Sequence, residues 1–322
     1  MNLTVLQGAV ELGLLYSLVA LGLYLSYRTL DLADLTTDSS FTLGAACSAM
    51  LTTLGHPVLG LLAALGAGAL AGGVTAFLQT KMRVMSILAG IITMTGLYSV
   101  NLMVMGGKAN LPMLKADNVF TLFTALFTNS GSAALAAFGG RFAKLLLGLV
   151  LAVLVCVLLV AFLRTQLGLS LRATGDNRDM VSASSVNPNF TTTVGLCMAN
   201  SLIALSGALI AQYQKYADIT MGTGMVVIGL ASLIIGEVLF GFKKRSVVRG
   251  VAAAVVGAVL YRIIISAALT ANVNPSNLKL VSALIVAAAI SYPAVADRVR
   301  FAKKRAAANR ALRARTESER GE

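Results

Sequence analysis

The chain has 322 residues, of which 57% are hydrophobic and 12% are charged, and its mean hydropathy is +0.82. This composition leaves too little polar surface to cover a soluble core of this size, so a bilayer must solvate much of the chain. The net charge of +13 does not indicate nucleic-acid binding, because Lys and Arg cluster at the ends of apolar runs and in the C-terminal tail. The composition therefore predicts a membrane protein with no nucleic-acid partner.

Apolar runs separated by short polar loops predict an all-α, polytopic membrane helical bundle of roughly nine spans. Cations at alternate span ends and in the tail place those ends in the cytoplasm, so we expect the C-terminus inside and the N-terminus outside. The predicted organisation is a transmembrane domain, 1–297, followed by a basic cytoplasmic tail, 298–322. The expected spans are 5–27, 41–54, 58–78, 84–105, 144–163, 190–214, 220–242, 250–269 and 278–295.

Two of these spans carry small residues at every fourth position, a spacing that lets membrane helices approach closely. We expect both faces to pack on protein rather than on lipid. The likeness of the two stretches also suggests an internal duplication, although abundant Ala and Gly mimic such repetition, and both explanations stay open. The positions are Gly60, Ala64, Gly68, Gly72 and Ala76 in the third span, and Gly250, Ala254 and Ala258 in the eighth.

The longest external connection is expected to run from residue 106 to residue 141. Residues 110–112, Asn-Leu-Pro, predict a turn within it. Residues 119–127 are apolar but too few to cross a bilayer, which predicts an interfacial or re-entrant helix on the outer face.

Residues 169–189 are polar although they lie between two uncharged apolar runs, so they predict a cytoplasmic loop. Helical spacing places Arg172, Asp176 and Asp179 on one side of a short helix, and an apolar patch follows. An exposed amphipathic helix between two spans is a docking element for another protein. The apolar patch is Met180, Ala183 and Val186.

Catalytic and metal-binding patterns are missing from the sequence. There is no Walker-type phosphate loop, no Cys-x-x-Cys pair and no pair of carboxylates at catalytic spacing. The single histidine, His56, precedes Pro57 and is interpreted as a turn residue. We therefore expect no catalytic residues, no metal site and no cofactor in this chain.

Charged residues within the spans are expected to face the bundle interior and to pair with one another, because an unpaired charge is costly there. They are Glu11, Glu237 and Arg262. For Glu237 the expected partners are Arg262 and Lys243, and a gating role stays open. The small residues of 222–236 predict that the seventh span begins as broken or re-entrant backbone.

Polar side chains and glycines at membrane depth are tolerated where they line a cavity or pack against protein. We therefore expect the solute pathway between the polar start of the second span and the seventh span. Helix capping competes with solute contact as the role of Asp31, Asp34 and Asp38, and it is the favoured interpretation. The predicted pathway residues are Asp38, Ser39, Ser40, Thr42, Thr95, Tyr98, Thr223, Gly229, Ser232 and Glu237.

The central loop carries a resemblance to a known family. Its motifs Arg172-Ala173, Asp176-Asn177 and Ala183 to Asn187-Pro188 resemble the cytoplasmic coupling loop of permeases in branched-chain amino acid and simple-sugar ABC importers. Residues 222–241 resemble the small-residue span of the same family. The resemblance covers nearly the whole chain and is nearest to the branched-chain amino acid-like branch. The chain departs from it at Ser185 and Glu237, where relatives often have Gly, and in its longer basic tail.

This resemblance implies the permease subunit of an ATP-driven importer in the bacterial inner membrane, paired with a second permease copy as a homodimer. It also implies cytoplasmic ATPase subunits that bind ATP and Mg, and an external binding protein that delivers the solute. An amino acid of branched-chain or aromatic type is expected. A sugar or nucleoside permease stays open, as does an ion-coupled secondary transporter with Asp38 or Glu237 as relay. The implied ATPase-coupling residues are Arg172, Asp176, Asn177, Asp179, Met180, Ala183 and Val186.

Overall fold

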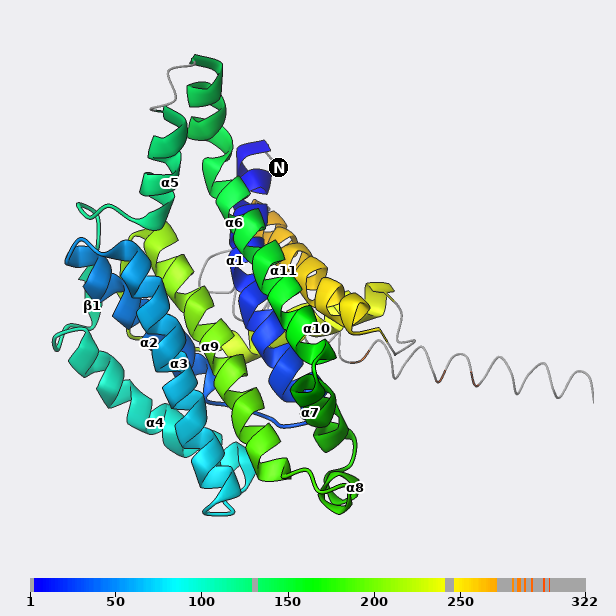
Figure 1. The fold of residues 1–322 in the computed structure, drawn as a ribbon. Helices are drawn as coiled ribbons and strands as arrows, with labels where there is room; N and C mark the ends of the chain where they lie inside the picture. The colour runs from blue at the N-terminus through cyan, green and yellow to red at the C-terminus, as the bar shows by residue number, and fades with distance from the viewer. Residues whose placement is uncertain are drawn as a thin grey trace, which may run out of the picture.

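The computed structural model describes residues 3–128, 133–240 and 246–270, with a few helical positions between 280 and 301. The described part is a helical bundle built around α1 and α9, and this confirms the expected all-α polytopic fold (Figure 1). The elements are α1 Leu3–Leu23, η1 Tyr24–Thr29, α2 Thr37–Thr53, α3 Pro57–Thr80, α4 Ser86–Val104, β1 Asn110–Pro112, α5 Val119–Thr128, α6 Ala133–Arg164, α7 Gln166–Asp176, α8 Arg178–Ala183, α9 Pro188–Gln214, β2 Tyr216–Asp218, α10 Met225–Phe240 and α11 Val247–Thr270.

Six helices of the described part are long and apolar enough to cross a membrane. Two further expected spans are helices of 17 and 16 residues, α2 and α10. At 1.5 Å per residue both measure about 25 Å, less than the ~30 Å hydrocarbon core. The ninth expected span and the basic tail lie almost wholly outside the described residues, so the count of nine stays a prediction. The six are Leu3–Thr29, Pro57–Thr80, Ser86–Val104, Phe142–Arg164, Pro188–Gln214 and Val247–Thr270.

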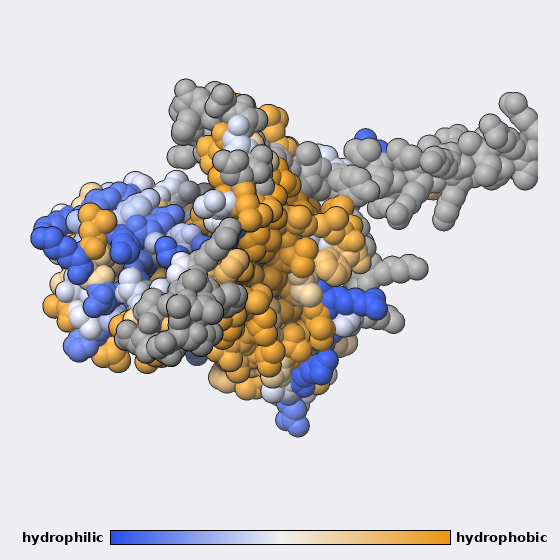
Figure 2. Space-filling view, turned by 90° about the horizontal axis from the view of Figure 1, so that it is seen from above, coloured by the Kyte–Doolittle hydropathy of each residue, from blue (hydrophilic) through white to orange (hydrophobic). Residues whose placement is uncertain are grey.

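The core lies where α1 and α9 meet, and α2, α3, α10 and α11 pack around this pair. Leu18, Leu21 and Ile203 are fully buried there. By contrast, most apolar side chains of α4 and α6 are exposed or half-exposed, which suits helices that face lipid. Figure 2 shows a broad apolar surface in the middle of the molecule, with hydrophilic residues gathered on the left, the side on which β1 lies in Figure 1.

The small-residue face of α3 packs on protein, as expected. Its five small residues at every fourth position are all buried, and a Cβ added at Gly68 or Gly72 would meet the backbone carbonyl of Asn200 or Leu196 on α9. The corresponding face of α11 is buried at Ala254 and Ala258. These contacts do not test the internal duplication, which stays a prediction.

The expected turn at residues 110–112 is wrong, because this segment is strand β1. It pairs antiparallel with β2, with Asn110 opposite Asp218 and Pro112 opposite Tyr216. The Asn and Pro signals are local, whereas the pairing strand lies about a hundred residues later in the chain and leaves no local trace. Further along the chain, the apolar stretch 119–127 is helical, as expected. It forms α5, a helix of 10 residues that packs on α6.

The seventh expected span begins as irregular backbone, as the small residues indicated. The chain has no helix between β2 and Met225, and the irregular segment 219–224 runs along α2. Ile219 belongs to the same buried hydrophobic cluster as Ala45 and Ala49 of α2. Gly222 lies against the Asp38 carbonyl, where no side chain would fit. The helix itself, α10, therefore starts five residues later than expected.

Candidate functional site

The central polar loop forms two helices, α7 and α8, at the opposite end of the bundle from the start of α1 (Figure 1). They are separated at Asn177, whose backbone is extended, with φ −160°. Its side-chain oxygen accepts a hydrogen bond from the Met180 N–H at 3.0 Å and caps α8, a position that Asn favours. The expectation of one helix with Arg172, Asp176 and Asp179 on one side is therefore wrong, because Asn177 ends the first helix.

The tip formed by α8 and the end of α7 is exposed. Asp176, Asn177, Asp179, Met180 and Ala183 all lie on it, and Val186 is half-buried. Because the tip combines carboxylates with an exposed Met side chain, it offers a partner both charge and apolar contact.

Arg172 differs from the other predicted coupling residues because its side chain is half-buried. Its charge acts on the hydroxyl of Tyr24 in η1, together with those of Arg28 and Glu237. Arg172 is thus set back from the exposed tip.

Helix α7 is fixed to the bundle along its inner side. Leu171 is buried, and the hydroxyls of Thr174 and Thr191 lie 2.8 Å apart in a buried hydrogen bond between α7 and α9. Gly175 lies directly on the Thr29 carbonyl oxygen at the end of η1, with no room for a Cβ. The exposed tip is therefore carried on a helix that touches both α9 and η1.

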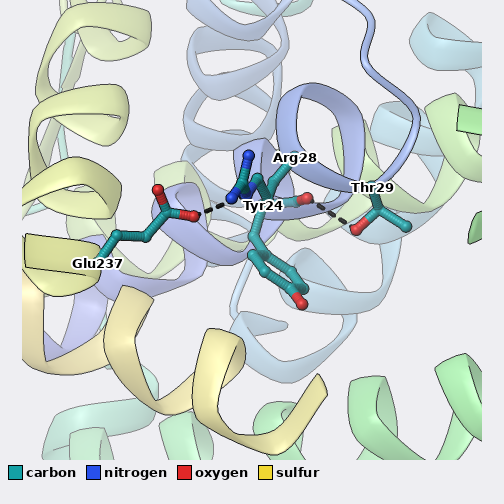
Figure 3. Close-up of polar contacts among 4 residues, drawn as sticks. All are labelled: Tyr24, Arg28, Thr29 and Glu237. Carbon is teal, nitrogen blue, oxygen red and sulfur yellow. Dashed lines mark hydrogen bonds and ion pairs between the residues drawn. The ribbon is translucent and has the colours of Figure 1, made fainter. Parts of the chain in front are cut away.

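Segment η1 continues α1 as a π-helix. The Leu30 N–H donates to the Leu25 carbonyl at 3.1 Å, and the Thr29 hydroxyl donates to the Tyr24 carbonyl at 3.0 Å. Figure 3 shows Arg28 of this segment facing Glu237 of α10, with 2.8 Å between Nε and Oε1.

Of the two expected partners of Glu237, Arg262 is wrong and Lys243 is not tested. Glu237 pairs with Arg28, Lys243 lies outside the described residues, and Arg262 lies over the Tyr16 ring, 3.7 Å from its centroid. The sequence argument considered cations close to Glu237 along the chain, whereas the bundle brings the end of α1 beside α10.

Asp38 holds the start of α10. Its carboxylate oxygens accept hydrogen bonds from the N–H groups of Gly224 at 2.8 Å and Val226 at 2.9 Å. The Thr42 hydroxyl accepts another from the Gly222 N–H at 3.1 Å. Asp38 also lies in the first turn of α2, so the positive N-terminal ends of two helix dipoles meet at one carboxylate.

The serines and the α4 residues of the predicted pathway lie on one side of this junction. The Ser39 hydroxyl donates to the Met94 carbonyl of α4 at 2.9 Å. Ser40 is fully buried, and its hydroxyl has no hydrogen-bond partner within the described part of the chain. Thr95 and Tyr98 are exposed on α4, and the Thr95 hydroxyl donates to the Ile91 carbonyl of the same helix at 2.8 Å.

The remaining predicted pathway residues lie on α10 or just before it and point in different directions. Thr223 is exposed beside the junction. Gly229 packs against Leu23 of α1, and Ser232 is buried and donates to its own helix at Ile228. The structure thus brings Asp38, Thr42 and Thr223 together but turns Gly229 and Ser232 toward the core; the pathway itself stays a prediction.

Sequence reasoning named Asp34 but missed the buried amides Asn200 and Gln212. The Asp34 carboxylate accepts hydrogen bonds from the Thr36 N–H at 2.9 Å and the Asn200 amide at 2.7 Å. Gln212 donates to the Ser48 hydroxyl and the Pro57 carbonyl, both at 2.9 Å. Asn200 and Gln212 stand in an otherwise apolar run, and this contrast could have marked them as interhelical contacts.

Comparison with known proteins gives consistent matches. A model of the family "Branched-chain amino acid transport system / permease component" matches residues 5–290. A tyrosine transport system permease protein of Clostridioides difficile (strain R20291) is 36% identical over 276 residues, 85% of this chain and 86% of that protein. An uncharacterized protein of Rickettsia prowazekii (strain Madrid E) is 31% identical over 293 residues, 90% of this chain and 98% of that protein. No solved structure matches.

The family match covers most of the chain, and the helices it covers are those that can cross a membrane. The chain belongs to the family of permease components of branched-chain amino acid transport systems, and it is a multi-pass membrane transport subunit.

Proposed function

We propose that this chain is the permease subunit of an ABC importer that carries an amino acid of branched-chain or aromatic type across the bacterial inner membrane. The observation that carries the proposal is the family match over residues 5–290, supported by the 36% identity to a tyrosine permease. A solute of this type fits a bundle whose polar groups at the α2–α10 junction are few and mostly bonded to backbone.

The partners of the proposed importer would bind at opposite ends. Two ATPase subunits, which bind the ATP and Mg, would dock on the exposed tip of α7 and α8. The external binding protein would approach the end that carries α5 and the β1–β2 ribbon. A second copy of the chain completes the pathway as a homodimer, and the exposed apolar face of α4 offers it a surface.

The carboxylates that an ion-coupled transporter would need are engaged in structural contacts. Both oxygens of Asp38 accept backbone N–H groups, and Glu237 is paired with Arg28. A proton or ion relay requires a carboxylate that exchanges its partner during transport. The geometry thus favours the ATP-driven importer over the ion-coupled alternative.

The test is uptake into proteoliposomes that contain the permease, its ATPase and its binding protein. We expect ATP-dependent accumulation of labelled tyrosine or leucine, and none of labelled glucose or uridine. Accumulation of the sugar or nucleoside alone would overturn the amino-acid assignment. Accumulation that follows an imposed ion gradient without ATP would overturn the ABC mechanism.

The docking site has its own control in the same preparation. Replacing Asp179 and Met180 together by Lys puts cations where the tip now offers an anion and an apolar contact, so the ATPase should no longer co-purify with the permease. Asp117→Lys, an exposed site near the outer ribbon, should leave co-purification unchanged. If the wild type, the double variant and Asp117→Lys all recover the same amount of ATPase, the docking site lies elsewhere.

A further inference from the structure

The π-helical segment η1 lies between the proposed docking helices and α10, and it touches both. On the docking side, Gly175 of α7 lies on the Thr29 carbonyl oxygen, and Leu30 and Leu171 meet over Gly195 of α9. These are close contacts between backbone and buried side chains with no space between them. A displacement of α7 toward the bundle must therefore move the end of η1.

On its other side, η1 is linked to α10 and α11. Arg28 forms the ion pair with Glu237 near the inner end of α10, and the Tyr24 ring packs on the backbone of α11 at Gly250 (Figure 3). Arg172 of α7 contributes a further charge close to the Tyr24 hydroxyl. Within the described part of the chain, Arg28–Glu237 is the one salt bridge, and it joins η1 to α10.

Helix α10 connects this cluster to the predicted pathway. It runs from Glu237 to Met225, and its first N–H groups are held by Asp38 at the start of α2. Gly236 lies directly against the Ala253 carbonyl of α11, so the two helices move as a packed pair. A shift at the Glu237 end is thereby carried along a helix about 24 Å long to the irregular segment 219–224.

A π-helix holds one more residue per turn than the α-helix that flanks it, and such segments occur frequently at functional sites. If its hydrogen bonds change from the i→i−5 to the i→i−4 pattern, the residues beyond it rotate and shift along the axis. Arg28 lies within this segment and Thr29 ends it. A change of pattern would therefore move the Gly175 contact and the Glu237 partner together.

We infer that η1, with the Arg28–Glu237 ion pair, transmits motion of the ATPase-docking helices to α10 and so couples ATP hydrolysis to opening of the pathway. Arg28 and Glu237 are positioning residues in this scheme, since neither needs to touch the solute. The inference rests on the proposed function as an ABC permease.

The test compares Arg28→Gln, Glu237→Gln and the exchanged pair Arg28→Glu with Glu237→Arg in the assembled complex. Each single variant should still bind the ATPase and hydrolyse ATP at the basal rate, because the docking tip is untouched. Stimulation of hydrolysis by the loaded binding protein, and uptake per ATP, should fall about fivefold or more. The exchanged pair should recover part of both, since it restores an ion pair between the same positions.

Arg249→Gln is the matched control, because it removes an exposed cation at the start of α11 without touching η1. It should keep wild-type coupling. Single variants with wild-type uptake per ATP would overturn the inference while the proposed function stands, and so would an exchanged pair no better than the single variants. A wild-type complex that fails to form or to transport would overturn the proposed function and the inference with it.

Discussion

Asp38 shows how one side chain can hold two helices that begin at the same depth. Each helix leaves N–H groups unpaired at its start, and at membrane depth no water is present to satisfy them. The Asp38 carboxylate satisfies two of these groups on α10, at Gly224 and Val226, while its negative charge favours the start of α2. The irregular segment 219–224 is tolerated inside the bundle because α2 supplies acceptors for it.

The first prediction concerns this cap. Asp38→Ala removes the acceptor for both N–H groups, and loss of such a cap costs about 0.5–2 kcal/mol. Hydrogen exchange of a peptide that spans 219–228 should become faster in the detergent-solubilised protein, with a lower unfolding temperature. Asp117→Ala is the control, because that carboxylate is exposed. Unchanged exchange at 219–228 would show that Asp38 does not hold the start of α10.

The sequence identified Asp38 but not its partners. An aspartate in the first turn of a predicted helix indicates capping, and this signal is local. Its partners lie 186 and 188 residues later, at Gly224 and Val226, and no local pattern connects the two segments. Arg28 is a second example. The sequence shows a cation at the end of the first span, but only the packing of α1 on α10 identifies Glu237 as its partner.

At the scale of the element, small residues decide how closely helices approach. Helix α3 offers a matched pair of glycines: a Cβ at Gly68 would lie 2.6 Å from the Ala204 Cβ and against the Asn200 carbonyl, whereas Gly66 has nothing within 4 Å. The four-residue spacing was visible in the sequence, and this explains why the buried face of α3 could be predicted. The length of α10 could not be predicted in this way, because the position of its first residue depends on hydrogen bonds to Asp38 of α2.

The second prediction uses these two glycines. Gly68→Ala should destabilise the bundle by about 1–3 kcal/mol, since α9 must shift to admit the methyl group. Gly66→Ala should be neutral or stabilise by about 0.5–1 kcal/mol, because Ala favours a helix interior. Thermal unfolding of both variants in the same detergent measures the difference. Equal unfolding temperatures would show that α3 and α9 are not in close contact.

The third prediction concerns the β1–β2 ribbon. The Thr220 hydroxyl and N–H, and then the Asn110 amide, donate to the Asp218 carboxylate and lower its pKa below the ordinary value. The ionised form is therefore favoured in the folded state. Its contribution is present above the ordinary aspartate pKa of about 4 and is lost as pH falls through the lowered pKa.

Asp218→Asn should accordingly lower the unfolding temperature at pH 7, and this effect should shrink as pH falls through the lowered pKa, where the wild-type carboxyl becomes protonated. The measurement is the difference in unfolding temperature between the two proteins across this range. A difference that stays constant with pH would show that the charge of Asp218 does not contribute.

At the scale of the whole molecule, composition and hydropathy were enough to predict a multi-pass helical bundle, because each span must satisfy its own backbone hydrogen bonds in lipid. They could not predict the ribbon between β1 and β2 or the division of the coupling loop at Asn177. The ribbon depends on contacts made after the spans have packed, whereas the break at Asn177 follows from a local side-chain cap that the sequence argument overlooked. The family resemblance came from the motifs of residues 169–189, and it is supported over residues 5–290.

The last prediction concerns orientation in the membrane. The start of α1 and helix α5 lie at one end of the bundle and the proposed docking helices α7 and α8 at the other (Figure 1), and α9 leads from α8 to β2 of the ribbon. If ATPases bind α8, residue 109 must face outward and residue 182 inward. Both Ala109 and Ser182 are exposed, and the native Cys47, Cys156 and Cys197 are half-buried and can be replaced by Ala.

In that cysteine-free background, Ala109→Cys should react with a membrane-impermeant maleimide in cells whose outer membrane is permeabilised. Ser182→Cys should react only after the inner membrane is opened. The two sites are chemically matched, since each is an exposed thiol outside the spans, so a difference in labelling reports the side of the membrane. The reverse pattern would place α7 and α8 outside, where no ATPase could reach them, and would remove the proposed route of coupling through η1.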